Sequence, residues 1–174
     1  MMKLLLGLLL LLYLPCPVTA GKLDPYQGFE QTPALALEDL GHTAHSLEDY
    51  RGRVVLVNFW ASWCAPCVIE MPSMQRLQEA MAGKPFTLLA VNVGESPGTV
   101  WKFAAKVRVQ FPLLLDRDGQ TASDWGIDIY PTSFLIDPQG RVQYVAYGPR
   151  EWDAPDMIQA IEGMFGKSVS EARQ

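Results

Sequence analysis

The sequence predicts an α/β fold in which a central mixed sheet is covered on both sides. In the first half of the chain, apolar strand-like runs alternate with helical patterns, which favours parallel strands joined by crossover helices. Near the end, the turn signal Asp137-Pro138-Gln139-Gly140 separates two strand-like runs and predicts an antiparallel hairpin at the sheet edge. Of the 174 residues, 49% are hydrophobic and 19% are charged, so the chain is able to bury one sizeable core.

The N-terminal segment, residues 1–20, has the pattern of a secretory signal. Lys3 precedes a run from Leu4 to Leu14 that is nearly all leucine, and small residues lead up to a cleavage point after Ala20. The apolar run is too short to span a bilayer comfortably as a helix. We therefore expect cleavage after Ala20 and an exported mature chain.

Two other interpretations of this segment compete with cleavage. Cys16 is a candidate lipidation site, but a lipoprotein signal has a small residue just before the cysteine, and Pro15 stands there. The segment is also a candidate membrane anchor that stays uncleaved. Beyond it we expect a linker over residues 21–32, which contain two glycines and a proline, a folded domain over 33–167 and a C-terminal tail over 168–174.

The elements of the first half follow from the local pattern. Ala34–Leu37 is a short strand candidate, and Leu47–Gly52 has the pattern of one helical turn that ends at its glycine. Val54–Ala61 is continuous and apolar with three valines, which indicates a strand buried on both faces. A helix is expected over Ala65–Met81, with a kink at Pro72, because an internal proline removes a helical hydrogen bond.

The second half continues the alternation of strands and helices. Phe86–Val93 is a second buried strand, and Ser96–Val107 has helical spacing, with Ser96 as its cap and Pro97 in its first position. The remaining expected elements are the strand Phe111–Leu115, the short helix Asp118–Trp125, the hairpin strands Thr132–Ile136 and Val142–Tyr147, and the closing amphipathic helix Asp153–Phe165.

Net charge and cysteine content limit the classes of function that the chain can have. The formal net charge is −5, or −6 once Lys3 leaves with the signal, and no cluster of Lys and Arg is visible, which argues against binding to nucleic acid or anionic lipid. After loss of residues 1–20, Cys64 and Cys67 are the only cysteines. The loop between them is too short for a useful structural staple, so we interpret the pair as redox-active.

The pair lies where the strand Val54–Ala61 gives way to a helix. A helix N-terminus carries partial positive charge and free N–H groups, which favour the thiolate of Cys64 over its thiol. Pro66 suits the same geometry, because a proline in the first turn loses no helical hydrogen bond. Since the thiolate is the attacking species in disulfide exchange, this motif predicts exchange of a disulfide with a partner.

Three motifs extend this interpretation. They are Trp60-Ala-Ser-Trp63-Cys64-Ala-Pro-Cys67, then Glu70-Met-Pro72, and finally Tyr130-Pro131-Thr132-Ser133-Phe134-Leu135-Ile136-Asp137 with Gly140. Together they resemble the thioredoxin superfamily, and more narrowly its exported thiol:disulfide oxidoreductases of the TlpA and ResA type. The resemblance covers roughly residues 31–167 and implies a thioredoxin-like three-layer α/β/α fold with a central mixed sheet. The stretch between Phe86–Val93 and Phe111–Leu115 is similar to the extra strand–helix insertion of this branch.

The resemblance also implies roles for individual residues. Cys64 would be the exposed nucleophile that forms a mixed disulfide, and Cys67 the partly buried thiol that resolves it, so that the two form the redox disulfide. Pro131 would be a cis-proline that faces the disulfide and docks the substrate backbone as an added strand. Tyr130 and Trp63 are candidate substrate-binding residues beside these positions, whereas Trp60 is expected in the core.

Glu70 has two possible roles. It lies three residues after Cys67 on the same helical face, so its carboxylate would sit beneath the thiol pair. There it would take and return the proton of Cys67, and partial burial would raise its pKa toward the useful range. In the related proteins, an acidic residue at this position is associated with that role. The alternative is an early-helix glutamate that complements the macrodipole. We favour the proton role, because the helix face that holds Cys67 must turn inward.

The expected function is that of a periplasmic or secreted thiol:disulfide oxidoreductase that reduces protein disulfides. The related proteins often act on apocytochrome c and are kept reduced by a membrane electron-donor thiol reductase, and we expect such partners here. We expect a monomer that needs no cofactor and binds no metal and no nucleic acid. Its redox potential is expected nearer that of thioredoxin than that of the strongly oxidising members.

Two alternatives from other classes stay open. A peroxiredoxin-like peroxidase shares the extended fold, but it would need a lone peroxidatic cysteine with a nearby Thr or Ser and an Arg, and that pattern is missing over Asn58–Cys64. A thiolate module that binds or delivers a soft ion such as Cu(I) would use the same two cysteines. His42 and His45 form an H-x-x-H pair, and without a third ligand at metal-like spacing we expect no metal site there.

Overall fold

The computed structural model of the protein describes residues 23–166. The expected signal over 1–20 and tail over 168–174 lie outside the described residues. Over the described range, no helix is long and apolar enough to cross a membrane.

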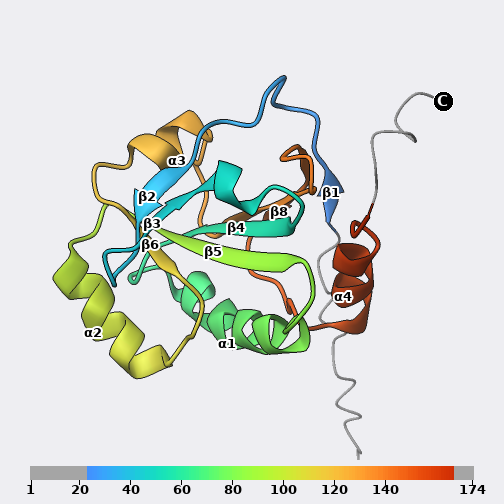
Figure 1. Cartoon of the computed structure of the whole chain (residues 1–174). Helices are drawn as coiled ribbons and strands as arrows, with labels where there is room; N and C mark the ends of the chain where they lie inside the picture. The colour runs from blue at the N-terminus through green and yellow to red at the C-terminus, as the bar shows by residue number, and fades with distance from the viewer. Residues whose placement is uncertain (1–22, 167–174) are drawn as a thin grey trace, which may run out of the picture.

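A six-stranded mixed sheet forms the centre of the fold (Figure 1). Its strands, from one edge to the other, are β1 (Asp24–Pro25), β8 (Val142–Tyr147), β7 (Thr132–Ile136), β4 (Val54–Trp60), β5 (Phe86–Val93) and β6 (Leu113–Asp116). β4, β5 and β6 are parallel to one another, whereas β7, β8 and β1 pair antiparallel. The mixed sheet confirms the predicted fold class. The predicted hairpin is β7–β8, but β1 and not the hairpin lies at that edge of the sheet.

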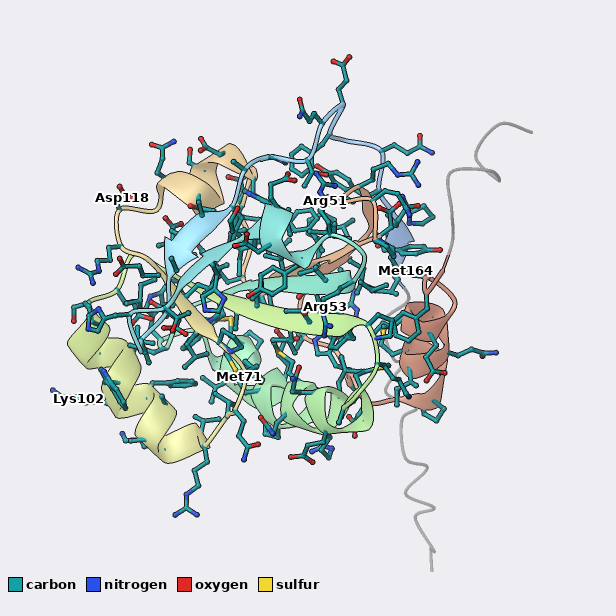
Figure 2. All side chains as sticks on the ribbon, in the orientation of Figure 1. Arg51, Arg53, Met71, Lys102, Asp118 and Met164 are labelled. Carbon is teal, nitrogen blue, oxygen red and sulfur yellow. A yellow bond between two sulfur atoms is a disulfide. The ribbon has the colours of Figure 1, made fainter. Side chains whose placement is uncertain are left out.

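Helices cover both faces of the sheet and give the three layers. One face carries α1 (Ala65–Ala80), α2 (Pro97–Val107) and α4 (Pro155–Glu162). The other face carries α3 (Gln120–Asp124), the 3-10 turn η1 (Leu47–Tyr50) and the small hairpin of β2 (Ala36–Glu38) and β3 (Ala44–Ser46). Figure 2 shows side chains filling the space between sheet and helices, with Met71 of α1 inside and Lys102 of α2 pointing away.

Strand β4 contributes side chains to two hydrophobic cores, one on each face of the sheet. All seven of its residues are buried. Val54, Leu56 and Trp60 pack on the α1 side, whereas Val55, Val57 and Phe59 pack on the α3 side. Successive side chains of a strand point to opposite faces, so a continuous apolar run is what a central, doubly covered strand requires.

Crossover helices connect the parallel strands as predicted. α1 joins β4 to β5, and α2 joins β5 to β6, which is the position of the expected insertion. Ser96 caps α2 by accepting a hydrogen bond from the Thr99 N–H at 3.2 Å. Pro72 lies inside α1, which continues to Ala80, and the kink there stays a prediction.

Two segments differ from the expectations. Residues 23–32, expected as linker, are attached to the fold: β1 pairs with β8 and forms the edge strand of the sheet, and the rings of Tyr26 and Phe29 lie 5.4 and 6.0 Å from that of Phe134. Apolar aromatic rings and an unpaired strand edge account for this attachment. The strand expected at Ala34–Leu37 is β2, which pairs with β3 outside the central sheet.

Candidate active site

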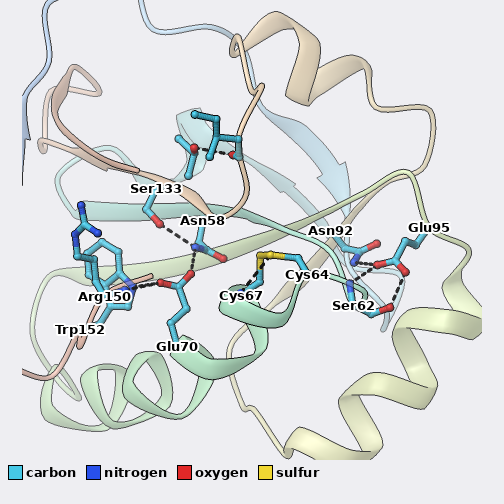
Figure 3. Close-up of a disulfide and its surroundings, with 12 residues drawn as sticks. Asn58, Ser62, Cys64, Cys67, Glu70, Asn92, Glu95, Ser133, Arg150 and Trp152 are labelled. Carbon is cyan, nitrogen blue, oxygen red and sulfur yellow. Dashed lines mark hydrogen bonds between the residues drawn. A yellow bond between two sulfur atoms is a disulfide. The ribbon is translucent and has the colours of Figure 1, made fainter. Parts of the chain in front are cut away.

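A disulfide joins Cys64 and Cys67 at the N-terminus of α1, with their Cα atoms 5.3 Å apart (Figure 3). Cys64 is the N-cap residue of the helix, and its Sγ accepts a hydrogen bond from the Cys67 N–H at 3.3 Å. Pro66 occupies the first turn, which contains no acidic side chain. The helix therefore presents a positive end to the Cys64 sulfur, which stabilises a thiolate when the disulfide opens.

The two sulfurs differ in access. Cys64 keeps 5% of its surface exposed and Cys67 keeps none. Cys64 is less exposed than the predicted nucleophile, because it belongs to the core on the α1 side of the sheet. Trp63 beside it is 69% exposed. A partner can therefore approach the pair only from the side of Cys64.

Glu70 is a buried carboxylate in the next turn of α1, only 1% exposed. It accepts hydrogen bonds from Asn58 Nδ2 at 2.8 Å, from the Arg150 backbone N–H at 3.1 Å and from Trp152 Nε1 at 3.0 Å. Burial raises the pKa of Glu70 to about 7, although these hydrogen bonds partly oppose the rise. Near neutral pH this carboxyl is therefore able both to take and to give a proton.

A second polar cluster holds the loop before Cys64. Glu95, after β5, accepts hydrogen bonds from both the N–H and the hydroxyl of Ser62, each at 2.6 Å. Asn92 Nδ2 donates to the same carboxylate at 2.7 Å. Figure 3 shows this cluster on one side of the disulfide and Glu70 on the other.

The Tyr130–Pro131 peptide bond is cis, at the start of β7. The rings of Trp63 and Tyr130 meet edge to face with their centroids 5.7 Å apart. This contact joins the segment before β7 to the loop that leads to Cys64. Ile129 is 56% exposed next to them. The predicted substrate-binding residues Trp63, Tyr130 and Pro131 thus come together on one side of the fold. Trp60 is fully buried against Phe103, which confirms its place in the core.

Comparison with known proteins places this site in a family. The sequence pattern of the AhpC/TSA family matches residues 29–145. The chain is 42% identical over 116 residues to the thiol-disulfide oxidoreductase ResA of Geobacillus thermodenitrificans, covering 67% of each chain. It is 37% identical over 131 residues to ResA of Bacillus subtilis, covering 75% of this chain and 73% of that one. The chain belongs to the AhpC/TSA family, among its thioredoxin-like thiol:disulfide oxidoreductases.

A solved structure agrees with this oxidoreductase in fold. The proposed thiol:disulfide interchange protein DsbE of Chlorobium tepidum superimposes with a TM-score of 0.71 at 35% identity, covering 85% of this chain and all of that one. The thioredoxin-like fold expected from the three motifs is thereby confirmed, as is the class of reaction.

Sequence reasoning missed four residues of the oxidoreductase site: Asn58, Asn92, Glu95 and Trp152. Asn58 interrupts an otherwise apolar strand, and Asn92 lies in a strand whose other residues are apolar except Thr87. A polar residue within a doubly buried strand is a signal that marks a buried hydrogen-bond network. Glu95 and Trp152 lie in connections and carry no comparable signal.

In residues 23–166, no group of three or more His, Cys, Asp or Glu side chains is placed to hold a metal ion. His45 instead lies between Tyr50 and Asp39, with its Nε2 at 3.1 Å from the Asp39 carboxylate. These two contacts join His45 of β3 to the turn of the β2–β3 hairpin and to η1.

Proposed function

We propose that this oxidoreductase is an exported reductant of protein disulfides. The observation that carries the proposal is the asymmetry of the pair: Cys64 caps a helix and keeps 5% of its surface exposed, whereas Cys67 keeps none and lies one turn before Glu70. Such an arrangement suits one sulfur to attack a partner and the other to finish the exchange inside the protein.

In the first step, the thiolate of reduced Cys64 attacks one sulfur of a substrate disulfide. A bond forms between Cys64 and that sulfur, the substrate S–S bond breaks, and the second substrate sulfur leaves as a thiolate that takes a proton from water. The helix N-terminus supports this step, because its partial positive charge stabilises the Cys64 thiolate relative to the thiol.

In the second step, Cys67 resolves the mixed disulfide. Its thiol gives a proton to the Glu70 carboxylate, and the resulting thiolate attacks the Cys64 sulfur. The Cys64–Cys67 disulfide forms, and the remaining substrate sulfur leaves as a thiolate and is protonated. Two electrons have then passed to the substrate. The pKa of Glu70, about 7, supports its role as the proton acceptor.

Substrate docking is assigned to the surface beside the disulfide. The backbone of Tyr130, just before the cis-proline, is assigned to pair with an extended substrate segment, because Pro131 has no N–H and its carbonyl already accepts a hydrogen bond from the Gly148 N–H at 2.8 Å. The exposed ring of Trp63 and the half-buried ring of Tyr130 supply apolar contact area around the substrate cysteine. Aromatic side chains give large contact areas at low cost in conformational entropy, which suits a protein that must hold several different segments.

The proposed cellular setting is supported by the signal-like pattern of residues 1–20. A chain released after Ala20 acts in the periplasm or outside the cell, and a chain that keeps the segment acts at the membrane surface. In either form, a membrane thiol reductase restores the dithiol, and apocytochrome c with oxidised haem-attachment cysteines is the proposed substrate. The working form is a monomer.

Insulin reduction, followed as turbidity with dithiothreitol, tests the proposal. Cys64→Ser should abolish the catalysed rate, Cys67→Ser should accumulate a mixed disulfide at Cys64, and Cys16→Ser is the matched control that keeps full activity. A redox titration against glutathione should give a potential nearer the about −270 mV of thioredoxin than the about −120 mV of DsbA. A value at the oxidising end, peroxide consumption without disulfide exchange, or copurified copper without exchange would each contradict the proposal.

A further inference from the structure

Asn58 is a buried amide in the strand that leads to the cysteine pair. It is fully buried in β4, where the six other residues are apolar. Burying an amide costs free energy unless its polar atoms are hydrogen-bonded. An apolar residue would suit the packing of this strand better, so the polar group at position 58 has a role beyond packing.

The orientation of this amide is fixed by two partners. Its Nδ2 donates to Glu70 Oε1 and to Ser133 Oγ, each at 2.8 Å. An ionised carboxylate can only accept hydrogen bonds, so Glu70 holds the nitrogen of the amide on its own side. The amide oxygen, Oδ1, is then turned away from both partners. It is buried and has no hydrogen-bond partner in the described part of the chain.

The free oxygen faces the cysteine pair. Figure 3 shows the Asn58 side chain between the Glu70 carboxylate and the disulfide, with Oδ1 on the disulfide side. Glu70 and Cys67 are three residues apart on α1, and side chains at this spacing are neighbours on one helix face. A group bonded to Glu70 beneath that face therefore lies beside Cys67, which is also fully buried.

A disulfide sulfur has no hydrogen to offer this oxygen, but a thiol does. We propose that Asn58 is a positioning residue of the exchange reaction: once the disulfide is reduced, Asn58 Oδ1 accepts a hydrogen bond from the Cys67 thiol, so that Cys67 stays protonated while Cys64 carries the thiolate. This proposal rests on the roles assigned to the two cysteines above.

This hydrogen bond makes the Cys67 thiol harder to ionise than the Cys64 thiol. A bond to the neutral form of a group disfavours its ionisation, so Asn58 keeps the Cys67 proton in place until the mixed disulfide has formed. The same amide then holds Glu70, the proposed acceptor of that proton. Cys64 and Glu70 are the titratable groups nearest to Cys67 along α1, and Arg150 before α4 is the charged group that acts on Glu70, whereas Asn58 of β4 and Ser133 of β7, the strand residues in this network, do not titrate.

The test measures the thiolate fraction of Cys67 against pH. In a full chain carrying Cys16→Ser and Cys64→Ser, Cys67 is the sole thiol, and its alkylation rate at each pH reports its ionisation. Asn58→Leu, which keeps the approximate volume but removes the acceptor, should give about threefold more thiolate at a given pH, as expected for loss of a weak S–H···O bond. Ser133→Ala is the matched control, because it removes the other partner of Asn58 Nδ2 and leaves Oδ1 in place. It should leave the thiolate fraction unchanged.

Unchanged ionisation of Cys67 in the Asn58→Leu variant overturns the proposal, and so does an equal rise in the Ser133→Ala variant. A matching rise at Cys64, measured with Cys16→Ser and Cys67→Ser, also overturns it, since the effect would not be specific to Cys67. If Asn58→Leu fails to fold, Asn58→Asp replaces it. A negative charge at this position should lower the thiolate fraction of Cys67 at least tenfold. An unchanged thiolate fraction contradicts the placement of residue 58 beside Cys67. Insulin reduction by the unsubstituted chain, run in parallel, shows separately whether the proposed function itself fails.

Discussion

Glu95 holds Ser62 through both the backbone N–H and the hydroxyl, each at 2.6 Å, across 33 residues of sequence. Ser62 stands two residues before Cys64, so this carboxylate fixes the path of the chain into the reactive sulfur. Hydrogen bonds to a charged acceptor are shorter and stronger than neutral ones, which suits Glu95 to this task.

Removing the Glu95 carboxylate should slow attack by Cys64. Glu95→Ala leaves the Ser62 N–H without its acceptor, and we expect a loss of about 1–3 kcal/mol in the free energy of unfolding and about a tenfold lower kcat/KM for insulin reduction. Glu95→Gln removes the same charge but keeps an acceptor oxygen, so it should stay close to the unsubstituted chain. Equal losses in both variants would assign the effect to charge and contradict a positioning role.

The pKa of Glu70 should depend on the indole of Trp152. Trp152 Nε1 donates to the carboxylate at 3.0 Å, and a bond to the charged form lowers a pKa. Trp152→Phe removes that donor, so the pKa should rise above about 7, measured by NMR titration of the Glu70 side-chain carboxyl in the oxidised chain. Trp125→Phe is the control: its Nε1 donates to the Ala34 carbonyl at 3.1 Å in the opposite core, and its loss should leave the Glu70 titration in place.

The free energy of unfolding should decrease as the pH rises through the pKa of Glu70. The pKa of this acid is about 7 in the folded chain against an ordinary value of 4.5, so the folded state holds the proton more tightly. The associated stabilisation is complete below about pH 4.5 and is lost as pH rises through 7, a change of about 3 kcal/mol. Urea unfolding of the oxidised chain at pH 5 and pH 8 measures it without interference from the thiols.

Glu70→Gln should abolish this component of the pH dependence, because glutamine does not ionise. The surface variant Glu79→Gln on the same helix is the control and should keep the full slope. If the Glu70→Gln chain loses stability with pH as steeply as the unsubstituted chain, the buried carboxyl is not the group that titrates.

The parts of the fold that could be predicted are those with local signals. The continuous apolar run of β4, the Ser96 cap of α2 and the turn at Asp137–Gly140 each follow from neighbouring residues, and the structure has the elements there. The attachment of residues 23–32 was missed, because a two-residue edge strand leaves no periodic pattern.

The residues of the candidate site also differ in whether a local sequence signal predicts them. The disulfide and the cis-proline lie in motifs that sequence alone reveals, whereas the partners of Glu70 depend on contacts across the fold. Trp152 is 82 residues from Glu70 along the chain, and its position is set by the path from β8 to α4. Among the partners of Glu70, only Asn58 carries a local sign of the buried network, because it is a polar residue within the apolar strand β4.

Substrate docking should depend on the exposed ring of Trp63 and the half-buried ring of Tyr130. Trp63 is 69% exposed and its ring meets that of Tyr130 at 5.7 Å, so truncation removes contact area for a partner but little of the core. Trp63→Ala should change the free energy of unfolding by less than about 0.5 kcal/mol. An aromatic contact contributes about 0.5–1.5 kcal/mol, so KM for a disulfide-bonded protein substrate should rise about two- to tenfold with kcat little changed. Tyr130→Phe keeps its ring and should behave like the unsubstituted chain, whereas Tyr130→Ala should raise KM as Trp63→Ala does and should also lower the free energy of unfolding, because the half-buried Tyr130 ring packs against the cores on both faces of the sheet. A fall in kcat at constant KM would instead show that these rings act on the sulfur chemistry and not on docking.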